Sequence, residues 1–307
     1  MSTAIYTHHA CLAHDPGPGH PESPARLAAV LEAIDEPRFS SLARIEAPAA
    51  TRAQLARVHA RELIDSVLDE PVTSGWRRLD PDTAMSPASA EAALRAAGAV
   101  CAAVDAAIDG THRRAFCAVR PPGHHATHDT VMGFCLFNSI AVGAAHALAA
   151  HGLSRVAIID FDVHHGNGTQ DIFWSDPRVL YASSHQWPLY PGTGARGETG
   201  AGNIVNAPLR PGSGSKEFRA ASEEILLPAI DSFAPELVMI SAGFDAHRLD
   251  PLANLDLDAD DYAWITTRLV EIADRHAQGR IVSSLEGGYS LTALRDSVGA
   301  HVAALNA

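Results

Sequence analysis

The feature that most limits the fold of this chain is an alternation of short apolar runs with longer amphipathic runs. The short runs are rich in β-branched residues, as in Val156-Ala-Ile-Ile and Leu237-Val-Met-Ile, whereas the longer runs are rich in Ala and Leu. This alternation is typical of βαβ units around a parallel sheet. Because the strands are apolar at both odd and even positions, helices should cover both faces of the sheet. We therefore expect a doubly wound, mainly parallel α/β fold.

The same pattern locates the elements. The expected strands are residues 116–119, 156–161, 179–183, 237–241 and 281–285. The expected helices are residues 88–108, 139–151, 216–233 and 258–276. Segments 15–24 and 188–202 are rich in Pro and Gly and are flanked by periodic segments, so we interpret them as ordered surface loops. A length of 307 residues, with 47% hydrophobic and 19% charged residues, is consistent with a single domain spanning 1–307.

Composition argues against several classes of function. The formal net charge of −13 disfavours a nucleic-acid partner, because phosphate contacts need clustered Lys and Arg, and it favours cationic partners. The four cysteines form no Cys-x-x-Cys pair, and Cys101 and Cys117 have apolar neighbours, as expected for free thiols in a reducing cytoplasm. No signal peptide and no run of 18 apolar residues is present, so we expect neither export nor membrane insertion.

Polar clusters follow the expected strands, where open α/β sheets bind ligands. They are Arg120-Pro-Pro-Gly-His124-His125, Asp160-Phe-Asp162-Val-His164-His165-Gly-Asn167, Ser183-Ser184-His185, Ala242-Gly-Phe-Asp245 and Glu286-Gly-Gly-Tyr289. Asp162 and His164 are two residues apart, which points both side chains to one side of an extended backbone. With Asp245 they would leave one coordination position open, as in a catalytic zinc site. Alternatively, the Asp residues cap the next helix and His165 packs inside.

The other clusters have two interpretations each. His124 and His125 can act as a general base and its electrostatic partner, or they can be structural. Tyr289 can donate to a developing oxyanion, or it can pack on the last helix. Gly133-Phe134-Cys135 and Trp187-Pro-Leu-Tyr190 place aromatic rings on loops, where they form either a slot for an aliphatic arm or part of the core.

Taken together, the motifs resemble the zinc hydrolases of the arginase/deacetylase fold: histone deacetylases, bacterial deacetylase-like amidohydrolases and acetylpolyamine amidohydrolases. The matching segments begin with His20-Pro-Glu-Ser-Pro and Arg-Pro-Pro-Gly-His-His-Ala, and continue with Met-Gly-Phe-Cys-Leu-Phe-Asn and Asp-Phe-Asp-Val-His-His-Gly-Asn-Gly-Thr-Gln. Pro-Gly-Thr-Gly, Ser-Ala-Gly-Phe-Asp-Ala and Glu-Gly-Gly-Tyr complete the series in family order.

The resemblance assigns a role to each matching residue. It implies that Asp162, His164 and Asp245 bind zinc, that His125 is the general base and acid, and that His124 is its electrostatic partner, oriented by Asp160. Tyr289 matches the tyrosine that binds the substrate carbonyl. Gly133, Phe134 and Tyr190 match the acyl-lysine channel, where Tyr190 replaces the usual Phe. Asn167 stands where class I members carry Asp, which is the class II-like choice.

The family also carries structural potassium ions. The matching positions are Asp160, Asp162, His164, Ser183 and Ser184, with a second site around Phe173, Asp176 and Val179. The ligand types at the zinc position also accept iron(II).

The implied reaction is removal of an acetyl or other short acyl group from a lysine side chain or similar amine. Acetylpolyamine hydrolysis is the alternative within the enzymes. Polyamine-selective relatives can carry Glu seven residues after the last zinc ligand, whereas this chain has Leu252, which favours an acyl-lysine peptide or a small neutral amide. Asp82 either recruits a cation at the channel rim or caps a helix.

Two further functions fit the sequence less well. A non-catalytic acyl-lysine binding protein would lack the tyrosine that Tyr289 supplies. A ureohydrolase would need carboxylates for a second metal, and these are not apparent near Asp162 and Asp245. The sequence is compatible with a homo-oligomer.

Overall fold

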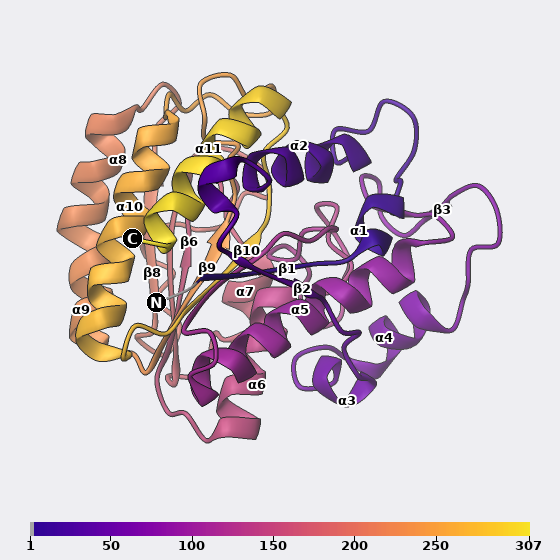
Figure 1. Ribbon diagram of the computed structural model, residues 1–307, viewed down its shortest axis with the longest axis horizontal. Helices are drawn as coiled ribbons and strands as arrows, with labels where there is room; N and C mark the ends of the chain where they lie inside the picture. Colours follow the sequence, from indigo (N-terminus) through magenta and orange to yellow (C-terminus); the bar gives the residue numbers. More distant parts are fainter. Residues whose placement is uncertain (1–2) are drawn as a thin grey trace.

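Eight parallel strands form the central sheet in the order β2-β1-β5-β10-β9-β6-β7-β8. Figure 1 shows helices on both sides of this sheet. The computed structural model describes residues 3–307. The strands are β1 (Thr3–Thr7), β2 (Ala43–Glu46), β5 (Arg114–Cys117), β6 (Val156–Asp160), β7 (Val179–Gln186), β8 (Ile204–Leu209), β9 (Leu237–Ala242) and β10 (Ile281–Leu285). A small antiparallel ribbon of β3 (Arg77–Arg78) and β4 (Ala84–Met85) lies outside this sheet.

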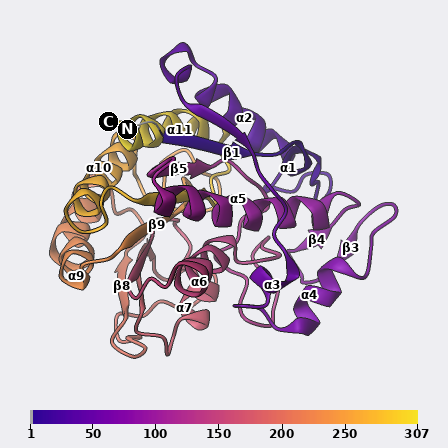
Figure 2. The ribbon, with the colours of Figure 1, turned by 60° about the horizontal axis from the view of Figure 1, so that its bottom comes forward.

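Helices cover both faces of the sheet, as the apolar strands predict. On one face α5 (Ser89–Asp109) packs on β1, β5 and β10, and its neighbour α6 (Ser139–His151) packs on β6 and β9. The other face carries α2 (Pro24–Ile34), α9 (Leu227–Phe233), α10 (Ala259–His276) and α11 (Leu291–Leu305), which Figure 2 shows as an arc along the sheet. The shorter helices are α1 (His9–Ala13), α3 (Arg52–Leu55), α4 (Arg61–Leu68), α7 (Asn167–Ile172) and α8 (Ser215–Ala221).

The predicted doubly wound fold is confirmed, with corrections to single elements. Strand 116–119 is shifted by two residues at both ends, to Arg114–Cys117, and strand 179–183 extends to Gln186. Helix 216–233 is divided into α8, a π-helical turn at Ser222–Leu226 and α9. The sequence pattern does not predict strands β1, β2, β3, β4 and β8 or helices α1, α2, α3, α4, α7 and α11.

All carboxyl ends of the parallel strands lie at one edge of the sheet, so the loops that follow them meet there. The strands that carry the predicted site are the four central neighbours β5, β10, β9 and β6. All four cysteines are buried and free, as expected for Cys101 and Cys117. Within the described residues, no helix combines the length and apolarity that crossing a bilayer requires.

Candidate functional site

Three predicted metal ligands meet at the ends of β6 and β9. Their ligand atoms lie within 4.8 Å of one another. His164 Nδ1 is 3.2 Å from Asp162 Oδ1 and 3.1 Å from Asp245 Oδ2. Backbone groups hold the other carboxylate oxygens: Gly287 N–H donates to Asp162 Oδ2 at 2.8 Å, and Val163 N–H donates to Asp245 Oδ1 at 2.8 Å. Each carboxylate thereby keeps one oxygen directed towards the imidazole.

The electrostatics of this cluster fit a divalent cation. Burial and the neighbouring Asp162 carboxylate raise the pKa of Asp245 to about 7. Burial lowers the pKa of His164, but its hydrogen bonds to Asp162 and Asp245 outweigh burial and raise that pKa to about 10. Two buried carboxylates and one imidazole nitrogen are ligands that zinc accepts. The residues present therefore fit the ion that the sequence predicts.

Gly287 makes the close approach of these groups possible. A Cβ at this position would lie 2.1 Å from Asp245 Oδ2 and 2.5 Å from Asp162 Oδ2, closer than a real Cβ tolerates. The alternative in which the Asp residues cap a helix is wrong, because α7 begins after Gly166 without a side-chain cap. His165 does pack inside, where its ring contacts Thr193 Oγ1 at 2.7 Å.

The tandem histidines have different partners. His124 Nδ1 faces Asp160 Oδ2 at 3.0 Å, whereas His125 Nδ1 faces Asn167 Oδ1 at 2.8 Å. Because an amide oxygen only accepts, His125 Nδ1 carries the proton and its Nε2 keeps a lone pair. Burial, reinforced by the His124 and His164 charges, holds the pKa of His125 well below its ordinary value. His125 is thus a neutral imidazole with one nitrogen available as a base.

The pKa of His124 is shifted in the opposite direction from that of His125. Burial lowers its pKa, but the carboxylates of Asp160 and Asp162 outweigh burial and raise it well above the ordinary value. Asp160 is itself fixed, because it accepts from the Tyr181 hydroxyl at 3.0 Å and from Asp162 N–H at 3.1 Å. A positive His124 beside a neutral His125 is an arrangement that can stabilise developing negative charge.

Tyr289 follows β10 and lies beside the channel. Burial raises the pKa of its phenol well above the ordinary value, so the hydroxyl stays protonated and can donate. The Arg26 guanidinium lies 4.8 Å from the centroid of the ring. Asp250 Oδ2 accepts from Tyr289 N–H at 2.7 Å and from Ser290 N–H at 3.3 Å. The position of Tyr289 is therefore fixed by the Arg26 contact with its ring and by the Asp250 hydrogen bond to its backbone.

A cavity of about 200 Å³ joins these groups to the surface. Every predicted substrate-contacting residue lines it, together with the predicted general base, one predicted metal ligand, the predicted catalytic tyrosine and Leu189: Asp82, His125, Gly133, Phe134, His164, Leu189, Tyr190, Leu252 and Tyr289. Tyr190 is 40% exposed at the mouth, and its ring centroid is 5.2 Å from that of His125. The structure thus places both aromatic residues at the cavity rather than in the core.

Asp82 holds one wall of this cavity. It accepts from Gly133 N–H at 3.0 Å, while the neighbouring Thr83 Oγ1 accepts from Phe134 N–H at 3.0 Å. Gly133 (φ 57°) and Phe134 (φ 68°) are both left-handed, a conformation that persists for Phe only where surrounding contacts enforce it. The helix-capping alternative for Asp82 is wrong, because the next helix begins only at Ser89.

The residues of the predicted potassium sites also lie together. Asp160 and Ser183 are register partners on β6 and β7, with buried Ser184 next to them. At the second position, the carbonyl oxygens of Phe173, Asp176 and Val179 all accept from Asn203 Nδ2, at 2.8, 3.1 and 2.8 Å. The carbonyl oxygens of the second predicted potassium site are thus already hydrogen-bonded to the Asn203 amide.

Comparison with known proteins identifies the same family as the sequence motifs. The family model for the histone deacetylase domain matches residues 20–305. This chain belongs to the histone deacetylase family. It is 38% identical over 313 residues to the histone deacetylase-like amidohydrolase of Pseudomonas aeruginosa, covering 94% of this chain and 82% of that protein. Similarity to a probable deacetylase of Archaeoglobus fulgidus is 39% over 298 residues, with 95% and 82% covered. Both names support a deacetylase or amidohydrolase.

A solved structure supports the fold of this family member. The crystal structure of the HDA15 HD domain superposes with a TM-score of 0.94 at 37% identity, covering 99% of this chain and 88% of that one. Membership therefore rests on sequence along almost the whole chain and on shape.

Sequence reasoning missed a buried ion network that supports this histone deacetylase site. Glu22 accepts from Arg26 Nη1 at 3.1 Å and from Arg120 Nη2 at 2.7 Å, and all three side chains are fully buried. Arg26 also donates to the carbonyl of Gly288, and Glu286 Oε2 accepts from His124 N–H at 3.1 Å. The available signal was the i,i+4 spacing of Glu22 and Arg26 at a helix start, next to an arginine before Pro-Pro.

Proposed function

We propose that this protein is a zinc-dependent amidohydrolase that removes acetyl or other short acyl groups from lysine side chains or similar amines. The observation that carries the proposal is a cavity lined by His164 of the metal-ligand cluster, by the neutral His125 and by the protonated Tyr289. We place this activity in one catalytic domain spanning 1–307.

Asp162, His164 and Asp245 would hold the ion, which supplies Lewis acidity to the scissile carbonyl and the attacking water. His125 Nε2 accepts the proton of that water as its oxygen bonds to the carbonyl carbon. The Tyr289 hydroxyl donates to the oxyanion that forms, and the positive charge of His124 stabilises it. The C–N bond then breaks, a histidine proton passes to the leaving amine, and a carboxylic acid and a free amine result.

Leu252 supports an acyl-lysine substrate over an acetylpolyamine. Its side chain lines the cavity mouth, where a carboxylate would be needed to attract a second ammonium group. The protein should therefore release acetate from an acetyl-lysine peptide with a higher kcat/KM than from acetylputrescine, and Leu252→Glu should shift the preference towards acetylputrescine. Absence of turnover with acetyl, trifluoroacetyl and longer acyl-lysine peptides in zinc-loaded protein would exclude the proposed function.

We also propose that potassium stabilises the fold through Asp160, Ser183 and Ser184, because register pairing of β6 and β7 brings these residues together. The melting temperature should be higher in potassium chloride than in tetramethylammonium chloride of equal ionic strength. Equal melting temperatures would count against this cation site.

A further inference from the structure

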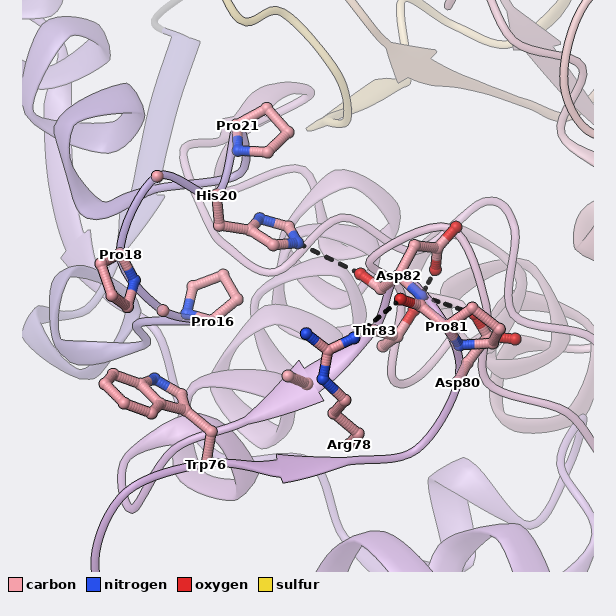
Figure 3. Close-up of a pocket in the computed structure, with 13 residues that line it drawn as sticks. Pro16, Pro18, His20, Pro21, Trp76, Arg78, Asp80, Pro81, Asp82 and Thr83 are labelled. Carbon is pink, nitrogen blue, oxygen red and sulfur yellow. Dashed lines mark hydrogen bonds between the residues drawn. The ribbon is translucent and has the colours of Figure 1, made fainter.

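A second cavity, of about 490 Å³, lies beside the mouth of the acyl channel. It is bounded by the Pro/Gly-rich loop 16–21 and by residues of the β3–β4 ribbon (Figure 3). Asp82 lines this cavity and the channel alike. Between the two, the His20 ring contacts the carbonyl of Asp82 at 3.1 Å and stacks edge-on against Phe134 at 4.7 Å. A substrate that fills the channel therefore emerges next to this cavity.

The cavity has a fixed aromatic wall. Trp76 is 52% exposed, yet its indole N–H donates to the carbonyl of Asp15 at 2.9 Å, which ties the ribbon to the proline-rich loop. Figure 3 shows the indole below Pro16 and Pro18, facing the space into which Arg78 projects. Exposed indoles that are already oriented by a hydrogen bond lose little conformational freedom when they bind a partner.

Arg78 provides an unpaired charge inside this cavity. Its Nη1 donates to the carbonyl of Pro81 at 3.2 Å, and among the described residues 3–307 it forms no ion pair. The two nearby acids are engaged by their own loops: Asp80 Oδ1 accepts from Asp82 N–H at 3.0 Å, and Asp82 Oδ1 accepts from Thr83 Oγ1 and Gly133 N–H. A guanidinium has five N–H donors, so most of those of Arg78 are available to a ligand.

We propose that this cavity, the Trp76 pocket, binds the polypeptide segment next to the acyl-lysine, and that Arg78 pairs with a carboxylate of that segment. The inference rests on the proposed function and names its substrate class. A guanidinium forms directed hydrogen bonds with a carboxylate and repels an ammonium group. The pocket thus favours acylated polypeptides with an acidic residue near the acyl-lysine and disfavours polyamines.

The test compares peptides that differ only near the acetyl-lysine. Blocked acetyl-lysine peptides carry Glu, Gln or Lys at one of the positions −2, −1, +1 or +2, and a further pair ends in acetyl-lysine as the free acid or the amide. At one position, kcat/KM for Glu should exceed that for Gln by roughly two- to five-fold at low salt, as for an exposed ion pair, and should fall as salt rises. A preference for the free acid instead would identify the α-carboxylate as the group bound.

Arg78→Gln should abolish the preference for the acid, and Arg78→Glu should reverse it in favour of the Lys peptide. Turnover of a minimal acetyl-lysine amide should remain unchanged in both variants. Arg113→Gln is the matched control, because Arg113 also donates to one carbonyl, that of Gln278 at 2.7 Å. Arg113 directly precedes β5 and so lies at the amino-terminal ends of the strands, away from the pocket. Trp76→Ala should lower kcat/KM for peptides but not for the minimal amide.

The outcomes separate the two proposals. Deacylation of all peptides with equal kcat/KM, or a preference for acid that persists in Arg78→Gln, would overturn the Trp76 pocket and leave the proposed function intact. Absence of deacylation of any peptide and of the minimal amide would overturn both.

Discussion

At the scale of single residues, the site is defined by neighbours that fix protonation. Asn167 leaves a lone pair on His125 Nε2, whereas Asp160 and Asp162 keep His124 positive. Burial keeps the Tyr289 phenol protonated. A base and a hydrogen-bond donor thus line one cavity, and a cation lies next to the base with its ring centroid 4.0 Å away, as acyl transfer to water requires.

Tyr289→Phe should lower kcat about 10²- to 10³-fold and change KM little, because the lost hydroxyl acts mainly on the oxyanion of the transition state. Steady-state kinetics with an acetyl-lysine peptide measure both constants. Tyr190→Phe is the control, since it removes the hydroxyl of another channel tyrosine and should keep kcat. A Tyr289→Phe enzyme with the parental kcat would show that the Tyr289 hydroxyl does not stabilise the transition state.

At the scale of elements, parallel strand ends and tight glycine turns assemble the site. Sequence predicted the metal ligands, the histidine turn and the tyrosine because each directly follows an apolar strand. Side-chain pairing between distant segments could not be predicted, because the i,i+4 spacing of Glu22 and Arg26 does not identify Arg120 as their third partner. The same limitation explains the start of β5, because the guanidinium of the buried Arg114 donates to the carbonyls of Leu305 and Ala307, which lie far along the chain.

Other elements were missed because their sequences resemble loops. Strand β8 contains Pro208 and Asn206, residues that are uncommon in strands, and it is tolerated as the edge strand of the sheet. Strand β2 is short, and its exposed residues Arg44 and Glu46 alternate with the apolar Ala43 and Ile45. It is the edge strand at the other end of the sheet from β8. The break within 216–233 is a π-helical turn that ends at Leu226, two positions before Pro228, whose ring cannot continue the regular hydrogen-bond pattern.

Gly287→Ala should abolish stoichiometric metal binding, because the new Cβ would displace the carboxylates of Asp162 and Asp245. Elemental analysis after dialysis against zinc should find about one ion per chain in the parent and much less in the variant. Gly197→Ala is the matched control, since a Cβ there meets nothing within 4 Å. One tightly bound ion in Gly287→Ala would refute this role of the glycine.

At the scale of the whole molecule, buried neutral histidines link stability to pH. Burial lowers the pKa of His59 to about 4 and that of His301 to about 3. His59 donates to the carbonyl of Thr127 and accepts from Asn138 N–H, so its neutral form is the one that fits. In the unfolded chain both titrate near pH 6.5, so between about pH 6.5 and 4 the unfolded state binds more protons.

The free energy of unfolding contributed by these residues should therefore be constant above pH 6.5 and decrease as the pH falls towards 4. His59→Gln should reduce the slope by up to about 1.4 kcal/mol per pH unit, the value for one proton. Urea denaturation of metal-free protein at several pH values measures the slope, and exposed His9→Gln is the control. An unchanged slope in His59→Gln would show that His59 does not contribute.

The Asp162, His164 and Asp245 cluster should make this protein a metal-dependent deacylase. The most direct test is a zinc titration of chelator-treated protein while acetate release from an acetyl-lysine peptide is followed. We predict that activity rises linearly up to one equivalent of zinc per chain and that Asp245→Ala remains inactive at every zinc concentration. Full activity in the metal-free protein or in Asp245→Ala would contradict the account.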